Sequence, residues 1–307
     1  MKIGLLPVDG TKFPNFAIMK IAAYEKSMGN DVEFVNFFEK YDIVYKSKVF
    51  THKPDCATII NAHEIIQGGT GYDYTKVLPD RIENIEPDYS LYPKFPHALG
   101  FLTRGCIRKC DFCIVSEKEG TTAPYRDIET ILQNKKSAVL MDNNVLSHEF
   151  GLEQIENIIR IGCKVDFNQG LDARLIDLET AKMLVKVKWI DSTIRLACDS
   201  KPMVEIILKT IEIFNGLGYR SRRFLVYALI TDDLIESYNR MNILKANDIM
   251  PFAQPFIDFT GKNKLKQWQK DMARWVNRKE YFNSCDFKDF EPRKGFKCSE
   301  YFKNYYL

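Results

Sequence analysis

The sequence predicts an α/β protein in which parallel strands alternate with helices, and three observations support this. Short apolar segments alternate with a helical pattern over residues 1–95. From Ala98 onward, six apolar segments of strand length recur with helical patterns between them. Residues 261–307 differ in composition, because they mix aromatic with basic residues. Strands that alternate with helices are typical of parallel sheets, so we expect two α/β units and a C-terminal tail.

The first unit, residues 1–95, is expected to be a small flavodoxin-like α/β domain. A strand is predicted over residues 2–6, and a helix runs from Pro14 to Met28, where Gly29-Asn30 ends it. Further strands are predicted at residues 31–35, 42–45 and 64–66. A glycine-rich turn, Gly68–Gly71, follows the last of them. Such a turn lets backbone amides approach a phosphate, but a tight turn without a ligand is the more common case.

The second unit, residues 96–260, follows a proline-rich linker and is expected to contain six β/α repeats. The predicted strands are residues 98–102, 137–141, 164–167, 193–197, 224–230 and 249–254. The predicted helices are residues 126–134, 151–161, 177–187, 202–217 and 233–246. Periodicity alone is compatible with any parallel α/β arrangement of these elements.

The tail, residues 261–307, is expected to begin with one helix from Lys264 to Tyr281 that covers the open side of the second unit. Beyond it, Phe and Tyr residues up to Tyr306 interleave with Lys and Arg. This mixture is compatible with nucleic-acid binding and also with aromatic side chains that pack inward while lysines stay in water. Of the two, packing is favoured.

Composition indicates a soluble globular chain, with 307 residues, 45% apolar and 28% charged. The sequence has no apolar run near the roughly 20 residues of a membrane span. Pro7 and Asp9 interrupt the amino terminus too early for a signal peptide, so we expect a cytoplasmic protein. The net charge of +3 excludes nothing by itself.

Three of the eight cysteines, Cys106, Cys110 and Cys113, fall in one short stretch with the spacing C-x3-C-x2-C. The stretch follows the strand predicted at 98–102, so the thiols lie at the carboxyl end of a strand, where α/β proteins usually build their sites. Thiolates are the usual ligands of iron–sulfur clusters, and a cubane cluster normally takes four. Three ligands leave one iron open to a small molecule.

This spacing, with Phe112 just before the last cysteine, resembles the signature of the radical S-adenosylmethionine (SAM) superfamily. The resemblance implies a partial (β/α)6 barrel, a 4Fe-4S cluster on the three cysteines, and SAM bound to the open iron with Phe112 near its adenine. It also implies reductive cleavage of SAM to a 5'-deoxyadenosyl radical and a reductant such as flavodoxin or ferredoxin. The substrate, a small molecule or a nucleotide-type compound, is not specified by any motif.

Polar residues after the predicted strands are the candidate SAM contacts. The resemblance implies contacts to the SAM amino group after the second strand, and to its ribose and carboxylate after the third. Arg174 suits the carboxylate because its guanidinium binds in a bidentate manner. Asp199 shares a strand face with Arg195, as Asp166 does with Asn168, and these faces suit a polar barrel interior. The candidate contacts are Phe112, Asp142, Asn143, Asn168, Gln169, Arg174 and Asp199.

Two alternatives remain beside this interpretation. The first unit resembles the cobalamin-binding domain of one radical-SAM class, but it is short and lacks the Asp-x-His-x-x-Gly motif, so cobalamin is not favoured. The second alternative is a zinc- or cluster-containing nucleic-acid-binding module that uses the basic tail, although a zinc site usually has a fourth Cys or His nearby. The cysteines at 56, 163 and 198 are expected to be buried apolar residues.

Overall fold

Two units make up the chain in the computed structural model, Met1–Pro96 and His97–Leu307. The structure describes residues 1–220, 223–258 and 264–305. Parts of the predicted tail, namely residues 261–263 and 306–307, lie outside these ranges. Within the described ranges, no helix combines the length and the apolar character that crossing a membrane requires.

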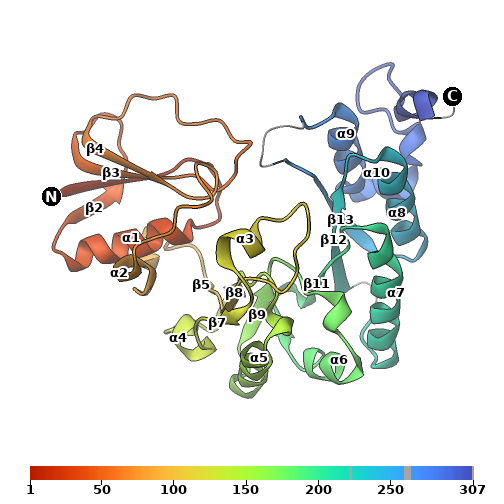
Figure 1. Cartoon of the computed structure of the whole chain (residues 1–307), viewed down its shortest axis with the longest axis horizontal. Helices are drawn as coiled ribbons and strands as arrows, with labels where there is room; N and C mark the ends of the chain where they lie inside the picture. Colours follow the sequence, from red (N-terminus) through yellow and green to blue (C-terminus); the bar gives the residue numbers. More distant parts are fainter. Residues whose placement is uncertain (221–222, 259–263, 306–307) are drawn as a thin grey trace. The chain divides into compact units, whose positions relative to one another are not determined.

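The first unit is a four-stranded parallel sheet with strand order β2-β1-β3-β4. Its elements are β1 (Lys2–Pro7), α1 (Phe16–Ser27), β2 (Asp31–Phe34), β3 (Tyr41–Ser47), β4 (Ala62–Gly68) and α2 (Asp80–Glu83). The side chain of Asn15 caps α1 by accepting a hydrogen bond from the Ile18 amide. Helix α1 packs on β1, β2 and β3 (Figure 1), and Ile3, Leu5 and Ile18 are fully buried there.

This sheet is parallel as predicted, but it differs from a doubly wound flavodoxin-like layer. The connections from β2 to β3 and from β3 to β4, both described in full, contain no helix. The glycine-rich turn packs closely against Lys48, the residue that follows β3. The approach leaves no room for a side chain at Gly69, where a Cβ would collide with the Lys48 carbonyl oxygen. The Gly71 amide donates a hydrogen bond to that same oxygen at 2.9 Å. Cys56 is only half-buried, so its predicted burial was wrong.

The second unit contains the six predicted strands, all parallel to their neighbours. Its elements up to β9 are β5 (Ala98–Gly100), β6 (Thr103–Arg104), α3 (Val115–Glu119), β7 (Ala123–Pro124), α4 (Ile128–Leu132), β8 (Ser137–Leu140), α5 (Glu149–Ile161) and β9 (Lys164–Phe167). They are followed by α6 (Leu178–Leu184), β10 (Lys188–Trp189), β11 (Ile194–Ala197), α7 (Lys201–Gly216), β12 (Phe224–Ile230), α8 (Leu234–Ala246) and β13 (Met250–Pro255).

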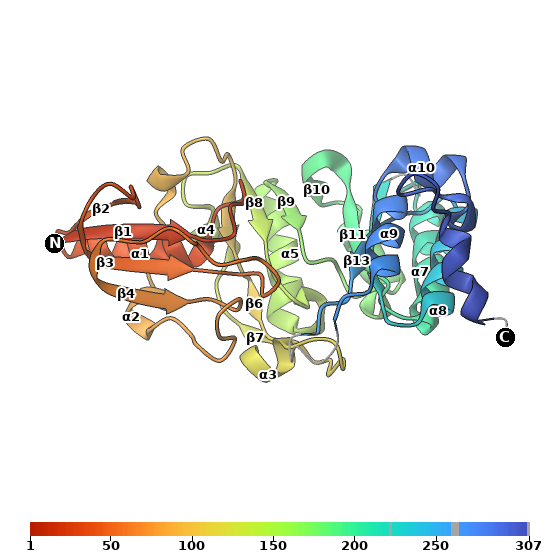
Figure 2. The same cartoon turned by 90° about the horizontal axis from the view of Figure 1, so that it is seen from above.

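These strands form two hydrogen-bonded sets, β10-β9-β8-β5 and β11-β12-β13. The sets meet at one isolated parallel bridge between Leu171 and Leu196, where the Leu171 amide donates to the Arg195 carbonyl at 2.8 Å. Helix α8 packs on β12 and β13, and α7 packs on α8 (Figures 1 and 2). Asp166 of β9 binds Arg195 of β11 through two hydrogen bonds of 2.7 and 2.9 Å, so these residues do share one side of the strands.

The described part of the tail contains two α-helices, α9 (Gln267–Val276) and α10 (Lys279–Ser284), where the sequence predicted one. Helix α9 ends at Asn277, whose side chain turns away to β13. Its Oδ1 accepts from the Ala253 amide at 2.7 Å, and its Nδ2 donates to the Ala253 carbonyl at 2.9 Å. These bonds attach the end of α9 to the edge of the sheet, which explains why the helix stops there.

Replacing Asn277 with alanine is expected to lower the free energy of unfolding by about 1–3 kcal/mol. The substitution removes both partners of the Ala253 backbone, which is 1% exposed, and unpaired buried backbone groups carry a cost of this size. Urea unfolding measures the effect. Asn247→Ala is the control, because that amide bonds only the Ile243 carbonyl within its own helix, and we expect a loss below about 0.5 kcal/mol. Equal losses for the two variants would contradict the role of Asn277.

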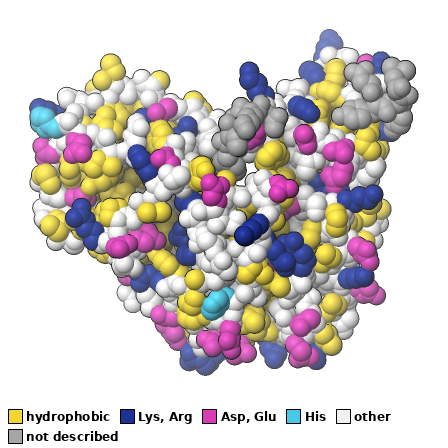
Figure 3. Space-filling model, viewed as in Figure 1, with side chains coloured by type: hydrophobic (Ala, Val, Ile, Leu, Met, Phe, Trp, Pro, Cys, Tyr) yellow, Lys and Arg dark blue, Asp and Glu magenta, His cyan; other side chains and the backbone are white. Residues whose placement is uncertain are grey.

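Three aromatic residues in the described part of the tail pack inward. Phe287, Phe290 and Phe302 are buried, and the Phe287 ring lies 5.5 Å from that of Trp275. Lys303 is 68% exposed, whereas Lys288 is half-buried and its Nζ lies 4.9 Å from the centroid of the Phe302 ring. On the face of the second unit visible in Figure 3, acidic and basic side chains are interspersed. This arrangement favours the packing interpretation of the tail over a nucleic-acid surface.

Candidate functional site

The loop that carries the three cysteines is anchored to the carboxyl end of β8. Asp142, which follows β8, accepts hydrogen bonds from the Leu102 amide (3.1 Å), the Thr103 amide (2.6 Å) and the Thr103 hydroxyl (2.8 Å). The Asp142 side chain is deeply buried, and this burial raises its pKa to about 6 even though three donors act in the opposite direction. Asp142 therefore has a positioning role that the sequence prediction did not include.

A short antiparallel hairpin, β6 with β7, holds the base of the cysteine loop. The Cys106 amide donates to the Gly120 carbonyl at 3.0 Å. Gly105 has a φ of +85°, and a Cβ there would lie 2.6 Å from the Thr121 carbonyl oxygen, so only glycine fits. The sequence prediction missed this hairpin, because strands of two residues have no periodicity to detect.

Glu119, at the end of α3, joins this hairpin to the segment after β8. Its carboxylate accepts two hydrogen bonds from the Arg104 guanidinium, at 3.1 and 2.6 Å, and one from the Gly105 amide at 3.0 Å. It also accepts from Asn143 Nδ2 at 3.0 Å. The predicted residue Asn143 is thus part of the framework of the loop. Glu119 is a further site residue, and no local sequence pattern predicts its role.

All three cysteines are free thiols, and they lie near one another. Burial and the neighbouring Cys113 raise the pKa of Cys110, with Cys106 adding to the effect. Cys106 Sγ accepts from the Arg108 amide at 3.3 Å and from Asn144 Nδ2 at 3.5 Å. Two N–H groups are therefore directed at the Cys106 sulfur.

The three thiols do not converge on one point. In the described ranges, no three His, Cys, Asp or Glu side chains are arranged so that they could hold a single metal ion. A cubane cluster makes a different demand, because each thiolate binds a different iron. Three neighbouring thiols, with N–H donors directed at one sulfur, have the donor chemistry that such a cluster requires.

Asn144 adds a second observation that points to a ligand. The residue is 3% exposed, and its Oδ1 is a buried acceptor that has no hydrogen-bond partner among the described residues. Its Nδ2 donates to Asp172 Oδ2 at 3.3 Å as well as to Cys106, which fixes the orientation of the amide. A buried acceptor without a partner costs about 1–3 kcal/mol, and an N–H group of a ligand would remove that cost. In the sequence, Asn144 belongs to the polar segment 142–144 after the second predicted strand, but only Asp142 and Asn143 of that segment were predicted as contacts.

Arg174 and Asp172 lie in the loop after β9 and form an ion pair. Arg174 Nε and Nη2 donate to the Asp172 carboxylate at 2.6 and 3.0 Å, and Arg108 Nε donates to it at 3.0 Å. Burial acts to raise the pKa of Asp172, but the two guanidinium groups outweigh it and hold the pKa below its usual value. The Cys106 and Cys110 thiols both interact electrostatically with Arg174, so this predicted residue does lie beside the cysteines.

The remaining predicted contacts are placed differently. Asp199, beyond β11, interacts electrostatically with Cys110 and Arg174, and burial raises its pKa. Phe112 is half-buried beside Cys113. Asn168 accepts at its carbonyl oxygen from the Tyr227 hydroxyl at 2.9 Å, and the exposed Gln169 donates to the Asn168 side chain at 3.3 Å. The structure therefore places Arg174 and Asp199 near the thiols, whereas the Gln169 side chain hydrogen-bonds, among the described residues, only to Asn168.

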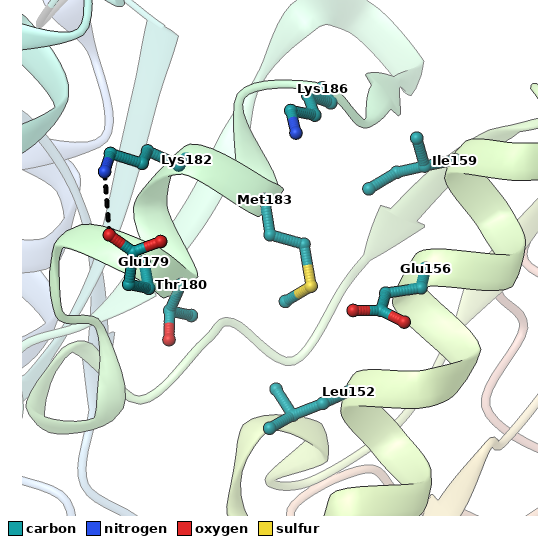
Figure 4. A pocket seen from close by; sticks show the side chains of 8 residues that line it. All are labelled: Leu152, Glu156, Ile159, Glu179, Thr180, Lys182, Met183 and Lys186. Atoms are coloured by element: carbon teal, nitrogen blue, oxygen red, sulfur yellow. Dashed lines mark hydrogen bonds and ion pairs between the residues drawn. The ribbon is translucent and has the colours of Figure 1, made fainter.

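A separate groove of about 490 Å³ lies between α5 and α6 (Figure 4). Met183 points into it, opposite Leu152 and Ile159 of α5, and Lys182 pairs with Glu179 at its edge. None of the predicted site residues lines this groove.

Comparisons with known proteins add little to this geometry. No protein-family model matches the chain, and no curated protein matches it significantly. Among solved structures, it is similar to Streptococcus suis SuiB bound to S-adenosylmethionine, with 18% sequence identity and a TM-score of 0.43. The match covers 56% of this chain and 43% of SuiB, so the chain spans less than half the length of that protein. Similarity at this level does not establish a shared fold, and the function is therefore inferred from the residues of the site.

Proposed function

We propose that the chain is a radical SAM enzyme with a partial (β/α)6 barrel. The observation that carries this proposal is the position of Cys106, Cys110 and Cys113 on one loop at the carboxyl end of parallel strands. Cys106, Cys110 and Cys113 would hold a 4Fe-4S cluster. When bound, that cluster supplies the electron that cleaves SAM to a 5'-deoxyadenosyl radical, which then abstracts hydrogen from the substrate.

The residues around the thiols suit the polar groups of SAM. Asn144 Oδ1, which has no hydrogen-bond partner among the described residues, can accept a hydrogen bond from an amino group. Arg174 is a donor for a carboxylate, and its side chain is 34% exposed. Asp199 offers a further acceptor on the β11 side of the site. For the substrate we propose only a class, a small molecule or a nucleotide-type compound. The electron donor would be a flavodoxin or a ferredoxin, and the enzyme would act in the cytoplasm.

Anaerobic reconstitution with iron and sulfide, followed by dithionite and SAM, tests the proposal. We expect about four irons per chain and the formation of 5'-deoxyadenosine, detected by chromatography. The variant with Cys106→Ala, Cys110→Ala and Cys113→Ala is expected to bind no cluster and to form no product, because it lacks every thiolate of the loop. The matched control is Cys163→Ala, since that buried thiol lies outside the loop. A wild-type preparation that takes up zinc and no iron would overturn the proposal.

A further inference from the structure

Asp172 joins three separate segments of the candidate site. Its carboxylate accepts from Arg108 of the cysteine loop, from Asn144 after β8, and from Arg174 in its own loop. It is 8% exposed, and these contacts have lengths of 3.0, 3.3 and 2.6 Å. A buried carboxylate with charged donors forms strong and directional hydrogen bonds. We propose that Asp172 is the positioning residue that fixes Arg108, Arg174 and Asn144 before the cofactor binds, an inference that rests on the proposed function.

The charge balance leaves both guanidinium groups able to bind an anion. The guanidinium groups of Arg108 and Arg174 both bind the Asp172 carboxylate, so these three side chains together carry a net charge of +1. Arg174 uses Nε and Nη2 on Asp172, and Arg108 uses Nε. Among the described residues, Arg174 Nη1 and both Nη atoms of Arg108 have no hydrogen-bond partner. Asp172 thus holds one edge of each guanidinium and leaves the other edge available to a ligand carboxylate.

Asp172 also determines which way the Asn144 amide faces. A carboxylate only accepts hydrogen bonds, so the amide must turn its Nδ2 toward Asp172. Its Oδ1 then points elsewhere and becomes the buried acceptor without a partner. One carboxylate therefore prepares two donors and one acceptor, which is the set of groups that an amino acid moiety such as that of SAM requires.

The simpler role of Asp172 is to cap the 3-10 turn Ala173–Leu175, because its Oδ1 also accepts from the Arg174 amide at 3.2 Å. Asparagine caps helical turns as well as aspartate does. Asp172→Asn therefore keeps the cap but loses the charge that holds two arginines. This substitution separates the positioning role from the capping role.

The first test uses amide hydrogen exchange in the full chain without iron. We expect the amides of residues 105–114 to exchange at least tenfold faster in Asp172→Asn than in wild type. Asp166→Asn is the matched control, since it breaks the bidentate pair between Asp166 of β9 and Arg195 of β11. For this variant we expect the exchange rates of residues 105–114 to change less than twofold. Unchanged exchange rates of these amides in Asp172→Asn, or an equal increase of the rates in both variants, would overturn the proposal. This measurement needs no cluster, so its failure is distinct from a failure of the proposed function.

The second test measures SAM affinity of the reconstituted chain by equilibrium dialysis. We expect Asp172→Asn to weaken binding by about tenfold to a hundredfold, as is usual for residues that orient ligand-binding groups. Because Asp172 acts in part through Arg174, the loss of SAM affinity in the double variant with Arg174→Gln should be smaller than the sum of the two single losses. Additive losses would contradict the proposal. If Asp172→Asn does not fold, Arg108→Gln decides, since it removes one half-exposed partner and should still accelerate exchange in the loop.

Discussion

The Arg240→Met variant is expected to unfold with a free energy about 3–5 kcal/mol below that of wild type. Arg240 of α8 is 1% exposed, and each of its three guanidinium nitrogens donates a hydrogen bond within the protein. Nη1 donates to the Cys198 carbonyl at 2.6 Å, Nη2 to the Leu229 carbonyl at 2.5 Å, and Nε to Glu236 at 2.8 Å. Methionine fills the space but leaves two carbonyl groups and a carboxylate without their partner.

Urea unfolding of the chain without iron measures this loss. The control is Lys209→Met in α7, where Lys209 pairs with Glu205 at the same i,i+4 spacing but the two side chains are 68% and 76% exposed. Exposed pairs contribute little, so no measurable change is expected there. Similar midpoints for Arg240→Met and wild type would show that the strand ends do not depend on Arg240.

The second large expected effect is a pH dependence of the free energy of unfolding, caused by Asp142. Its pKa is raised from 3.8 to about 6 in the folded chain. Between about pH 4 and pH 6 the folded state therefore binds more protons than the unfolded state, and stability falls as pH rises. One pKa unit corresponds to about 1.4 kcal/mol, so this group alone lowers the free energy of unfolding on the order of 3 kcal/mol across that window.

Comparison with Asp142→Asn isolates this contribution. The variant loses a carboxylate acceptor at every pH, but it has no titrating group at this position. The difference in unfolding free energy, wild type minus variant, should fall on the order of 3 kcal/mol from pH 4 to pH 7, when both are unfolded by urea at each pH. Parallel profiles for the two proteins would mean that the pKa of Asp142 is not raised.

The sequence was sufficient to predict the strands of the second unit, because buried parallel strands are short apolar segments between helical patterns. Residues 164–167 and 224–230 match β9 and β12 without error. Alternation also assigned Asp166 and Arg195 to the polar faces of their own strands, and the two form an ion pair. These successes share a local cause, the period of the side chains along one element.

The framework of the site was not predictable in this way. Glu119, Asn144 and Asp172 each bind at least one partner that lies 14 to 64 residues away, and no periodicity encodes such contacts. The single helix predicted in the tail was wrong for a similar reason, because Asn277 ends α9 by binding Ala253 in a distant strand. In the first unit, the pattern of strands was right, but it did not reveal that two crossovers lack helices.

The bridge between Leu171 and Leu196 has a consequence for how a ligand affects the second unit. The cysteines belong to the strand set on one side of this bridge, and Asp199 belongs to the set on the other. A molecule that contacts the thiols and Asp199 together would tie the two sets at a place where the backbone provides one parallel bridge. Its binding energy would add to the cohesion of the sheet, so the occupied chain would resist heat better than the empty one.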